Sequence, residues 1–290
     1  MSFSNIVDTR DLKKIISWVT CYDYSFACAI QESKVDMVLV GDSASMVVLG
    51  EKTTSPATME QMIIFAKAVR KGAPSKIVVG DLPRGSYESS DLSAVENAMR
   101  FCKEGECDAV KLEGGLRMAS RVKSIVDAGI PVIGHIGLTP QSLVQFGGYR
   151  VTGRSTKEVE WLMSEAKALE AAGAVAILIE ATPPETSQVI RDSVKIPIFG
   201  IGAGGNLDGQ LLILHDLLGL YPIFRPKFAK NYIVEVVSSF AEELKKNSDV
   251  IQYGRETRRD GLFELALKAL NLYADEVSAK KFPTHEYLYK

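Results

Sequence analysis

The stretch AVKLEGGLRMASRVKSIVDAGIPVIGH (residues 109–135) contains the pattern that decides the fold. It begins with a short apolar run (109–112), continues as a helical pattern over 117–128 that ends at Gly129, and closes with a second apolar run (131–135). Continuous apolar runs of this length are typical of parallel strands that are buried on both faces, and glycine commonly ends a helix. The stretch therefore predicts a strand–helix–strand unit with parallel strands.

Similar units recur along the whole chain. We expect strands at residues 15–20, 36–40, 76–80, 109–112, 131–135, 174–179, 196–201 and 211–215, and helices that include 59–71, 92–104, 117–128, 157–172 and 184–192. Eight alternations without a linker-like segment predict an α/β fold of the (β/α)8 TIM-barrel type, for which about 250 residues are usual. A doubly wound open sheet is the alternative. We expect residues 1–290 to form a single domain.

The end of the chain has a different pattern. Residues 232–271 are helical in character but are interrupted by the polar stretch 247–260. We interpret this part as extra C-terminal helices with an inserted surface segment near 247–261, to which the sequence assigns no function.

Composition excludes several classes of protein. The 290 residues are 46% hydrophobic and 24% charged, with a formal net charge of −2, as in ordinary soluble globular proteins. A nearly neutral chain gives no reason to expect nucleic acid or an anionic membrane as partner. No apolar run approaches the ~20 residues of a membrane span, so we expect a protein without a membrane partner.

The cysteines and the N-terminus indicate a reducing compartment. The four cysteines form no CxxC pair and have no matching histidine spacing, so free thiols are expected rather than disulfides or a zinc site: Cys21, Cys28, Cys102 and Cys107. Residues 1–14 are polar and lack the apolar core of a signal peptide. These features together predict a soluble, cytoplasmic protein.

Polar side chains follow the first expected strand, as Tyr22 and Asp23, and also stand at the ends of the next five. From the second strand to the sixth they are Asp42 and Ser43, Asp81, Lys111 and Glu113, His135, and Glu180. The carboxyl ends of barrel strands meet at one mouth, where such barrels build their active sites. The alternative is that the carboxylates only cap the helices that follow, but a run over five strands favours an active site.

Three of these carboxylates suit a hard divalent cation such as Mg²⁺. Mg²⁺ prefers oxygen ligands and takes only one or two carboxylates directly, because it keeps several waters. We predict Asp42 and Asp81 as metal ligands, with Glu113 holding a bound water. Zinc is disfavoured because only His135 offers nitrogen. A metal would polarise a substrate carbonyl and so stabilise an enolate formed at the adjacent carbon.

Formation of an enolate also needs a base that is not bound to the metal. Glu180 follows an apolar strand, and the neighbouring Ala181 and Pro183 are expected to desolvate its carboxylate and raise its basicity. The alternative is a carboxylate hydrogen-bonded to a loop amide. Lys111 is expected to bind a substrate carboxylate, or else to pair with Asp42 or Glu113 inside the barrel.

Three further signals are weak. Residues 200–205 satisfy GxGxxG but lack the βαβ context of a dinucleotide site, so we expect close backbone approach to a neighbour or ligand. His215 is interpreted as a structural histidine at the end of the eighth strand. The glycine-hinged loop 146–154 suits either a lid or an ordinary surface loop.

With these residues in view, the chain resembles the ketopantoate hydroxymethyltransferase family. The resemblance extends from about residue 15 to the end. It is carried by TCYDYS (20–25), VGDS (40–43), RKGAP (70–74), VKLEGG (110–115), GHIGLTPQS (134–142), GGYRV (147–151), GIGAG (200–204), DGQ (208–210), PKFAK (226–230) and FP (282–283). Motifs of this length in this order are highly specific.

The resemblance implies transfer of a hydroxymethyl group from 5,10-methylenetetrahydrofolate to 3-methyl-2-oxobutanoate, giving ketopantoate for pantothenate and coenzyme A biosynthesis. It implies Mg²⁺ on Asp42 and Asp81 and, through water, on Glu113. It further implies that Ser43 and Lys111 bind the keto acid, that Glu180 is the base, and that His135 lies near the one-carbon unit. Members of the family are homo-oligomers, often decamers.

Some residues beside the expected site depart from the family pattern. Ala44-Ser45 stands where Leu-Gly is usual, and Arg84-Gly85 stands where Phe-Met is usual. These changes leave the preferred 2-oxo acid open. One alternative is a lyase or mutase of the phosphoenolpyruvate mutase and isocitrate lyase type. The other is a non-catalytic paralogue that binds a keto acid, which would not need the base Glu180.

Overall fold

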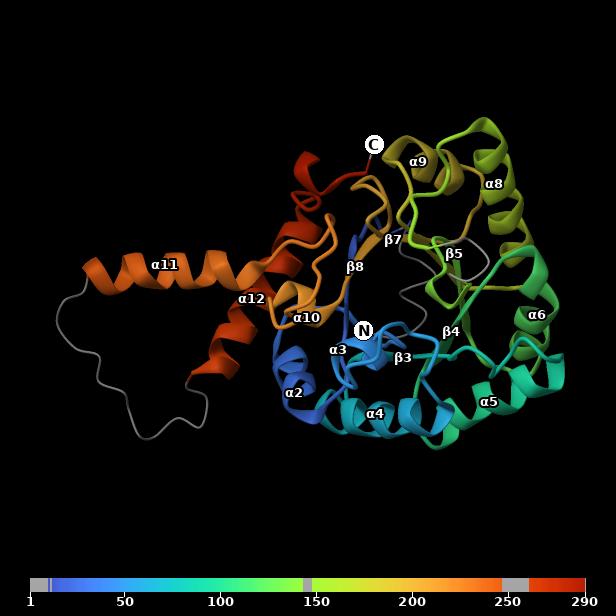
Figure 1. Cartoon of the computed structure of the whole chain (residues 1–290), viewed down its shortest axis with the longest axis horizontal. Helices are drawn as coiled ribbons and strands as arrows, with labels where there is room; N and C mark the ends of the chain where they lie inside the picture. The colour runs from blue at the N-terminus through green and yellow to red at the C-terminus, as the bar shows by residue number, and fades with distance from the viewer. Residues whose placement is uncertain (1–9, 11, 143–147, 247–260, 290) are drawn as a thin grey trace.

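The eight strands close into a barrel in which every neighbouring pair is parallel and β8 pairs with β1 (Figure 1). The structure is a computed structural model that describes residues 10, 12–142, 148–246 and 261–289, without the side chains of 240–246. The strands are β1 (Ile16–Thr20), β2 (Met37–Val40), β3 (Ile77–Asp81), β4 (Ala109–Glu113), β5 (Val132–Gly137), β6 (Ala176–Glu180), β7 (Ile198–Ile201) and β8 (Gly209–Leu212). The predicted (β/α)8 barrel is confirmed, and the open sheet is excluded.

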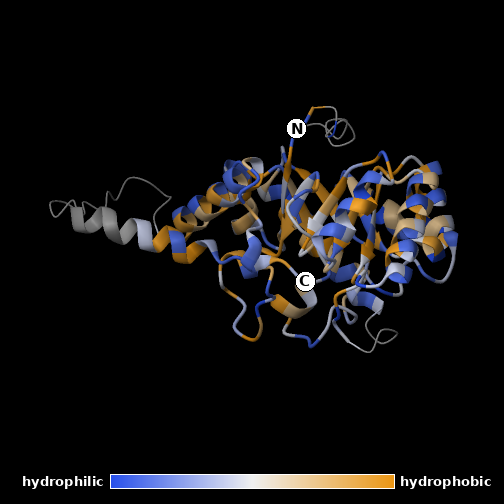
Figure 2. Cartoon of the chain, turned by 90° about the horizontal axis from the view of Figure 1, so that it is seen from above, coloured by the Kyte–Doolittle hydropathy of each residue, from blue (hydrophilic) through white to orange (hydrophobic). Residues whose placement is uncertain are grey.

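Helices follow every strand except β7, which leads directly to β8, and the longer helices form an outer ring. They are α2 (Tyr24–Glu32), α3 (Ala44–Val47), α4 (Met59–Gly72), α5 (Asp91–Lys103), α6 (Ala119–Asp127), α8 (Thr156–Ala171), α9 (Pro184–Asp192) and α10 (Leu214–Leu217). Thr58 and Ser155 begin α4 and α8 with reciprocal capping boxes, which satisfy backbone donors at these helix ends. Hydrophilic residues are frequent on the outer helices, and hydrophobic ones run along the strands (Figure 2).

The core lies inside the barrel and between the barrel and its helices. Trp18 and Phe199 meet edge to face in the interior, with ring centroids 5.8 Å apart. Tertiary packing explains why residue 80 is glycine, because a Cβ there would overlap the ring of Phe101 and push α5 off the sheet. Burial of this apolar surface is the main force that holds the barrel together.

Two C-terminal helices complete the structure, as the sequence predicts. Helix α12 (Leu262–Ser278) lies against β1 and α2, and the hydroxyl of Tyr273 lies 3.0 Å from the carbonyl oxygen of Trp18 and 2.6 Å from that of Gln210. Helix α11 (Tyr232–Lys246) packs on α12 and projects away from the barrel (Figure 1). The expected insertion near 247–261 lies outside the described residues apart from its last position.

The expected eighth strand was placed too late in the sequence. It was predicted at 211–215, but β8 is Gly209–Leu212, and His215 lies in the short helix α10. The strand begins with Gly209, which packs so closely on Ile16 that a Cβ would clash. Its apolar pattern is therefore weak at the start, and the apolar residues of α10 continue the run beyond its end.

A buried ion-pair cluster lies at the N-terminal end of the barrel. The carboxylate of Asp208, only 3% exposed, accepts hydrogen bonds from Arg10 Nε at 2.9 Å, Arg191 Nη2 at 2.6 Å and the backbone N–H of Ile198 at 2.9 Å. Removing one partner of a buried ion pair is costly, because the charge of the remaining partner stays buried without compensation. Asp208 thus ties the start of the chain and the end of α9 to the start of β7.

We expect Asp208→Ala to lower the free energy of unfolding by about 3 kcal/mol, because two guanidinium groups and an amide lose their acceptor. Asp192→Ala is the matched control, since this 60%-exposed carboxylate contacts the same Arg191 at 3.5 Å. The control is expected to change stability by less than about 1 kcal/mol. Urea unfolding at one fixed protein concentration measures both, and equal effects of the two substitutions would contradict the assignment.

Candidate active site

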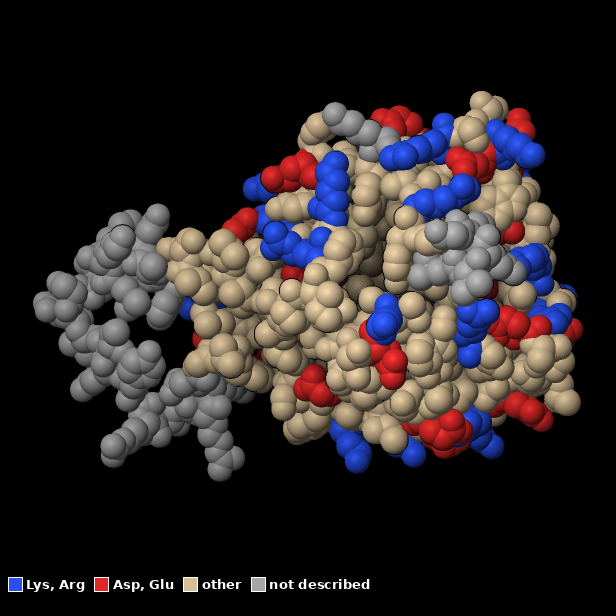
Figure 3. Space-filling view, in the orientation of Figure 1, with Lys and Arg blue, Asp and Glu red and all other residues tan. Residues whose placement is uncertain are grey.

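The predicted site residues converge at the carboxyl ends of β2 to β6. Asp81 and Glu180 are the last residues of β3 and β6, and Asp42 follows β2 by two positions. Lys111 and Glu113 point to the same side of β4, because side chains alternate along a strand. The short helices α3 and α10, which follow β2 and β8, lie on the face turned to the reader in Figure 1, and Figure 3 shows that face hollowed near its centre.

Lys111 is held by the carboxylates around it. Its Nζ lies 2.6 Å from Asp81 Oδ1 and 3.9 Å from Glu113 Oε1, and all three side chains are at most 3% exposed. Burial opposes the charge of Lys111, but Asp81, Glu113 and Asp42 together raise the pKa of its ammonium. The expectation of a pair inside the barrel holds, although the closest partner is Asp81 rather than Asp42 or Glu113.

One lysine does not compensate the negative charge of the three buried carboxylates. Burial raises the pKa of Asp81 to about 8 and that of Glu113 to about 8, against the opposing effect of Lys111. Asp81 Oδ2 accepts the backbone N–H of Asp42 at 3.0 Å, while Glu113 Oε1 accepts no hydrogen bond within the described residues. When Asp42, Asp81 and Glu113 are all ionised, Lys111 leaves two negative charges unbalanced.

A hard divalent cation fits this donor set. It would supply the two missing charges, and Glu113 Oε1 is a buried acceptor without a hydrogen bond. Within the described parts of the chain, no three His, Cys, Asp or Glu side chains are close enough to hold a metal by themselves.

His135 lies between two carboxylates. Its Nδ1 is 3.5 Å from Glu113 Oε1, and its Nε2 is 3.3 Å from Glu180 Oε2. Burial, followed by the charge of Lys111, lowers the pKa of His135, so the imidazole is neutral near pH 7. It separates Glu180 from the group formed by Asp42, Asp81 and Glu113.

Glu180 has the surroundings expected of a base. Burial raises the pKa of its carboxyl group, against the opposing effect of His135. Its carboxylate faces His135, and no loop amide of the described residues donates to it. Ala181, the next residue, is buried and has a φ of 47°, a conformation that is uncommon outside glycine and occurs at functional sites.

Ser43 is connected to two further hydroxyl groups. Its Oγ lies 2.8 Å from the hydroxyl of Tyr22, which donates to Thr20 Oγ1 at 2.7 Å. Asp23, beside Tyr22, accepts the backbone N–H of Phe26 and caps α2, so here the helix-cap interpretation is right. The sequence placed Tyr22 after the first strand, among the residues at the mouth, but assigned it no separate role.

Gln141 and Tyr87 are two other residues that sequence reasoning missed. Gln141 Nε2 donates to Asp42 Oδ2 at 2.9 Å, and its backbone N–H donates to Glu113 Oε2 at 2.9 Å. The hydroxyl of Tyr87 donates to Gln141 Oε1 at 2.7 Å. Gln141 belongs to the longest motif quoted above, and that was its only signal in the sequence.

The weaker sequence signals have structural explanations. In the loop 200–205, Gly202 packs on Phe228 and Gly204 on Pro184, each too closely for a Cβ, so this loop passes close to neighbours as expected. His215 packs against the Tyr22 ring with centroids 5.4 Å apart.

Loop 146–154 is described only from residue 148. There Tyr149 is exposed, with its hydroxyl 3.8 Å from Met46 Sδ.

The two unusual residues after Asp81 face outward. Arg84 is exposed, and its guanidinium lies 3.5 Å from Ser55 Oγ. Gly85 has a φ of 89°, a conformation that favours glycine, and its N–H donates to Glu88 Oε2 at 2.8 Å. Glu88 therefore binds the backbone of Gly85, and the geometry favours a solvent-facing Arg84 over one directed at a ligand.

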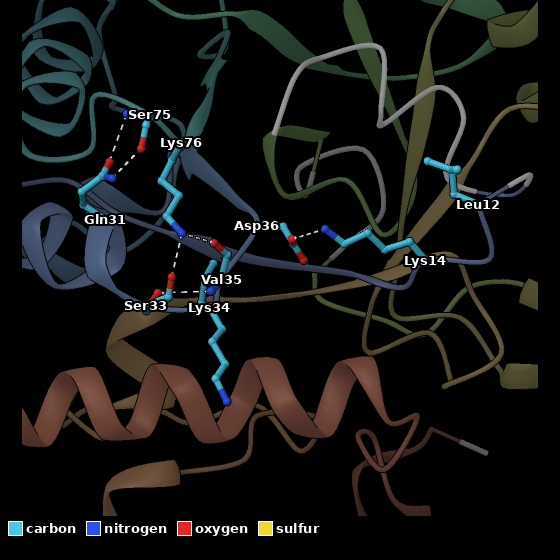
Figure 4. A pocket seen from close by; sticks show the side chains of 9 residues that line it. All are labelled: Leu12, Lys14, Gln31, Ser33, Lys34, Val35, Asp36, Ser75 and Lys76. Carbon is cyan, nitrogen blue, oxygen red and sulfur yellow. Dashed lines mark hydrogen bonds and ion pairs between the residues drawn. The ribbon is translucent and has the colours of Figure 1, made fainter.

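A separate cavity of about 420 Å³ lies at the opposite end of the barrel (Figure 4). Its charged groups have partners, since Lys14 Nζ is 2.6 Å from Asp36 Oδ1 and Lys76 Nζ donates to the carbonyls of Ser33 and Val35. In such barrels this end contributes to stability, whereas active sites lie at the other end. The cavity is therefore not the candidate active site.

The four cysteines are free thiols, as predicted. In the part of the chain that the structure describes, no helix is long and apolar enough to cross a membrane.

Comparisons with known proteins point to one family. The sequence model of the family described as ketopantoate hydroxymethyltransferase matches residues 1–255. A relative from Alkaliphilus metalliredigens is 43% identical over 98% of this chain and 92% of its own length. One from Heliobacterium modesticaldum is 49% identical over 76% of this chain and 79% of its own. Both are named 3-methyl-2-oxobutanoate hydroxymethyltransferase.

Solved structures share the fold at low sequence identity. A 2,3-dimethylmalate lyase of the PEP mutase/isocitrate lyase superfamily has a TM-score of 0.57 and 16% identity, over 97% of this chain and 99% of the other. A phosphonopyruvate hydrolase solved with oxalate and Mg²⁺ has a TM-score of 0.59 and 11% identity, over 94% and 95%. At such identities the likeness concerns the fold alone.

Proposed function

Since the chain belongs to the ketopantoate hydroxymethyltransferase family and is an enzyme of this type, we propose that it converts 3-methyl-2-oxobutanoate into ketopantoate. The hydroxymethyl group comes from 5,10-methylenetetrahydrofolate. The observation that carries this proposal is the separation of the partly buried Glu180 from the buried carboxylates of Asp42, Asp81 and Glu113, with His135 between them. Enolate chemistry needs such a division between a base and an electrophilic centre.

Asp42 and Asp81 are proposed to hold a divalent cation, Mg²⁺ or a similar ion, with Glu113 acting through a water. The unbalanced charge of the three buried carboxylates supports this assignment, as does Glu113 Oε1, which accepts no hydrogen bond within the described residues. When bound, the cation would polarise the substrate's carbonyl group and so lower the cost of negative charge on its oxygen.

Lys111 and Ser43 are proposed to bind and orient the keto acid. Lys111 is fully charged, because neighbouring carboxylates raise its pKa, and a charged ammonium attracts the substrate's carboxylate. The hydroxyl of Ser43 is held by Tyr22, which in turn is anchored on Thr20, so its direction is restricted. Restricted groups lose little entropy when they position a substrate.

Glu180 is proposed to remove the proton at C3 of the keto acid. The C–H bond breaks, its proton moves to the carboxylate, and its electron pair becomes the enolate double bond. Water adds to the methylene carbon of the folate, whose two C–N bonds break, and this releases tetrahydrofolate and leaves the carbon as formaldehyde. C3 of the enolate then forms a bond to that carbon, and the former carbonyl oxygen of formaldehyde becomes the hydroxyl group by taking the proton held by Glu180. His135 is proposed to lie near the incoming one-carbon unit, a role that its position 3.3 Å from Glu180 supports.

We also propose that the protein acts in the cytoplasm as a single-domain subunit of a homo-oligomer, a decamer by resemblance. Exposed apolar side chains near α11 support assembly, namely Ile223, Phe224, Val234 and Val237. Apolar side chains gathered on a projecting helix and the loop before it are typical of surfaces that another protein chain covers.

The direct test is turnover of 3-methyl-2-oxobutanoate with 5,10-methylenetetrahydrofolate and Mg²⁺. We expect ketopantoate to form only when all three are present, with 2-oxoglutarate a much poorer substrate because Arg84 faces solvent. A lyase of the alternative type would instead cleave 2,3-dimethylmalate without folate, and a non-catalytic paralogue would bind the keto acid without converting it. Either result would replace the proposed function.

A further inference from the structure

Gln141 contacts all three strand ends that carry the candidate metal carboxylates. Its side-chain amide donates to Asp42 Oδ2 at 2.9 Å after β2 and to the carbonyl of Leu82, next to Asp81, at 3.0 Å after β3. Its backbone N–H donates to Glu113 Oε2 at 2.9 Å on β4. Gln141 itself comes from the short 3-10 turn Pro140–Ser142 after β5 and is 2% exposed.

Asp42, Leu82 and Tyr87 together fix which way the amide of Gln141 points. The Tyr87 hydroxyl lies 2.7 Å from Gln141 Oε1, to which it donates, and 3.2 Å from both the backbone N–H and the carbonyl oxygen of Glu113. If the amide were flipped, its oxygen would face two acceptors, Asp42 Oδ2 and the Leu82 carbonyl, and its NH₂ group would face the hydroxyl. The network therefore permits one orientation, with both amide protons used.

These contacts restrict each carboxylate on one side only. Gln141 engages Asp42 Oδ2 and Glu113 Oε2, which leaves the second oxygen of each carboxylate for another partner. In the described residues Glu113 Oε1 accepts no hydrogen bond. A residue that only filled the core would not need to be polar, because a buried polar group costs free energy unless it finds a partner. Gln141 is polar, and it donates to two acids from different strands.

We propose that Gln141, oriented by Tyr87, is a positioning residue that holds Asp42 and Glu113 in the geometry in which they bind a divalent cation. This inference rests on the proposed function, which places the cation on Asp42 and Asp81. Partners that orient the ligands of a metal commonly contribute 10–100-fold to its affinity, since without them the carboxylates must be ordered when the metal binds.

The test is calorimetric titration of Mg²⁺ into the substrate-free protein. Gln141→Leu, which keeps side-chain bulk but removes the amide, is expected to weaken Mg²⁺ binding by roughly 10–100-fold. Tyr87→Phe removes only the hydroxyl that orients the amide and is expected to weaken binding in the same direction by a smaller factor. Because Tyr87→Phe keeps the ring packing, it decides the question even if Gln141→Leu fails to fold.

Gln210→Leu is the matched control. Gln210 is also 2% exposed, and its amide donates to the carbonyl of Gly204 at 2.9 Å without contacting any of the candidate carboxylates. It should lower thermal stability and leave Mg²⁺ affinity unchanged. If wild type binds Mg²⁺ and folded Tyr87→Phe and Gln141→Leu bind it equally well, this inference is wrong while the proposed function stands. If wild type does not bind Mg²⁺, the metal assignment itself fails.

Discussion

Glu180→Gln is expected to slow exchange of the C3 proton of 3-methyl-2-oxobutanoate with D2O by about 10²–10⁴-fold, the usual cost of removing a general base. Glutamine keeps the size of the side chain, so it should occupy the same place beside His135, which lies 3.3 Å from the carboxylate. Fold and keto-acid binding should therefore survive. Nuclear magnetic resonance follows the exchange directly, without folate, and isolates the proton-transfer step.

Glu165→Gln is the matched control for this experiment. Burial raises the pKa of Glu165 as it does that of Glu180, but Glu165 lies on α8 and accepts the backbone N–H groups of Gly115 and Leu116. Its substitution should leave exchange within a few-fold of wild type. Undiminished exchange in Glu180→Gln would mean that another residue removes the proton.

The pH dependence of exchange follows from the same group. Only ionised Glu180 can accept a proton, and burial raises its pKa above the ordinary value for glutamate. The rate should therefore rise with pH through that raised pKa and fall as the carboxyl becomes protonated at lower pH. A rate that is flat across this range would argue against Glu180 as the base.

Asp81→Asn is expected to weaken binding of Mg²⁺ in the presence of keto acid by at least about 100-fold, more than loss of a residue that only orients a ligand. The substitution removes a proposed ligand and also the charge that faces Lys111 Nζ at 2.6 Å. An ammonium without that partner would repel the cation. Calorimetric titration measures the change.

Asp36→Asn serves as the matched control for Asp81→Asn. Asp36 stands before β2 at the opposite end of the barrel, where it accepts Lys14 Nζ at 2.6 Å and the backbone N–H of Ser17 at 3.0 Å. It has the same chemistry and a lysine partner but lies away from the site, so Mg²⁺ affinity should not change. Wild-type affinity in Asp81→Asn would refute the ligand assignment.

Much of this molecule could be predicted from its sequence, for a physical reason. Parallel barrel strands are buried on both faces and appear as apolar runs, and their carboxyl ends must meet at one mouth. Knowing where the strands end was therefore enough to group Asp42, Asp81, Glu113 and Glu180. The start of β8 was harder to predict from the sequence, because its first residue is a glycine that close contact with Ile16 requires and that strand propensity does not favour.

Contacts between distant segments account for what the sequence did not reveal. Gln141 and Asp42 are 99 positions apart, and Tyr87 and Gln141 are 54 apart, so no local pattern links them. Glu113 was predicted as a partner of Lys111, but the closer partner Asp81 was not, because the register that places Asp81 beside Lys111 is a property of the closed barrel. The exposed position of Arg84 likewise depends on contacts between distant segments, which the local sequence does not show.

The central claim is transfer of one carbon to C3 of the keto acid, and carbon-13 labelling tests it most directly. The enzyme is incubated with Mg²⁺, 3-methyl-2-oxobutanoate and 5,10-methylenetetrahydrofolate that carries ¹³C in its methylene group, and the products are followed by nuclear magnetic resonance. We expect the label to appear as a hydroxymethyl carbon bonded to C3 of ketopantoate, and to be absent from that position with Glu180→Gln. Label that stays on folate while wild-type enzyme consumes the keto acid would contradict the claim.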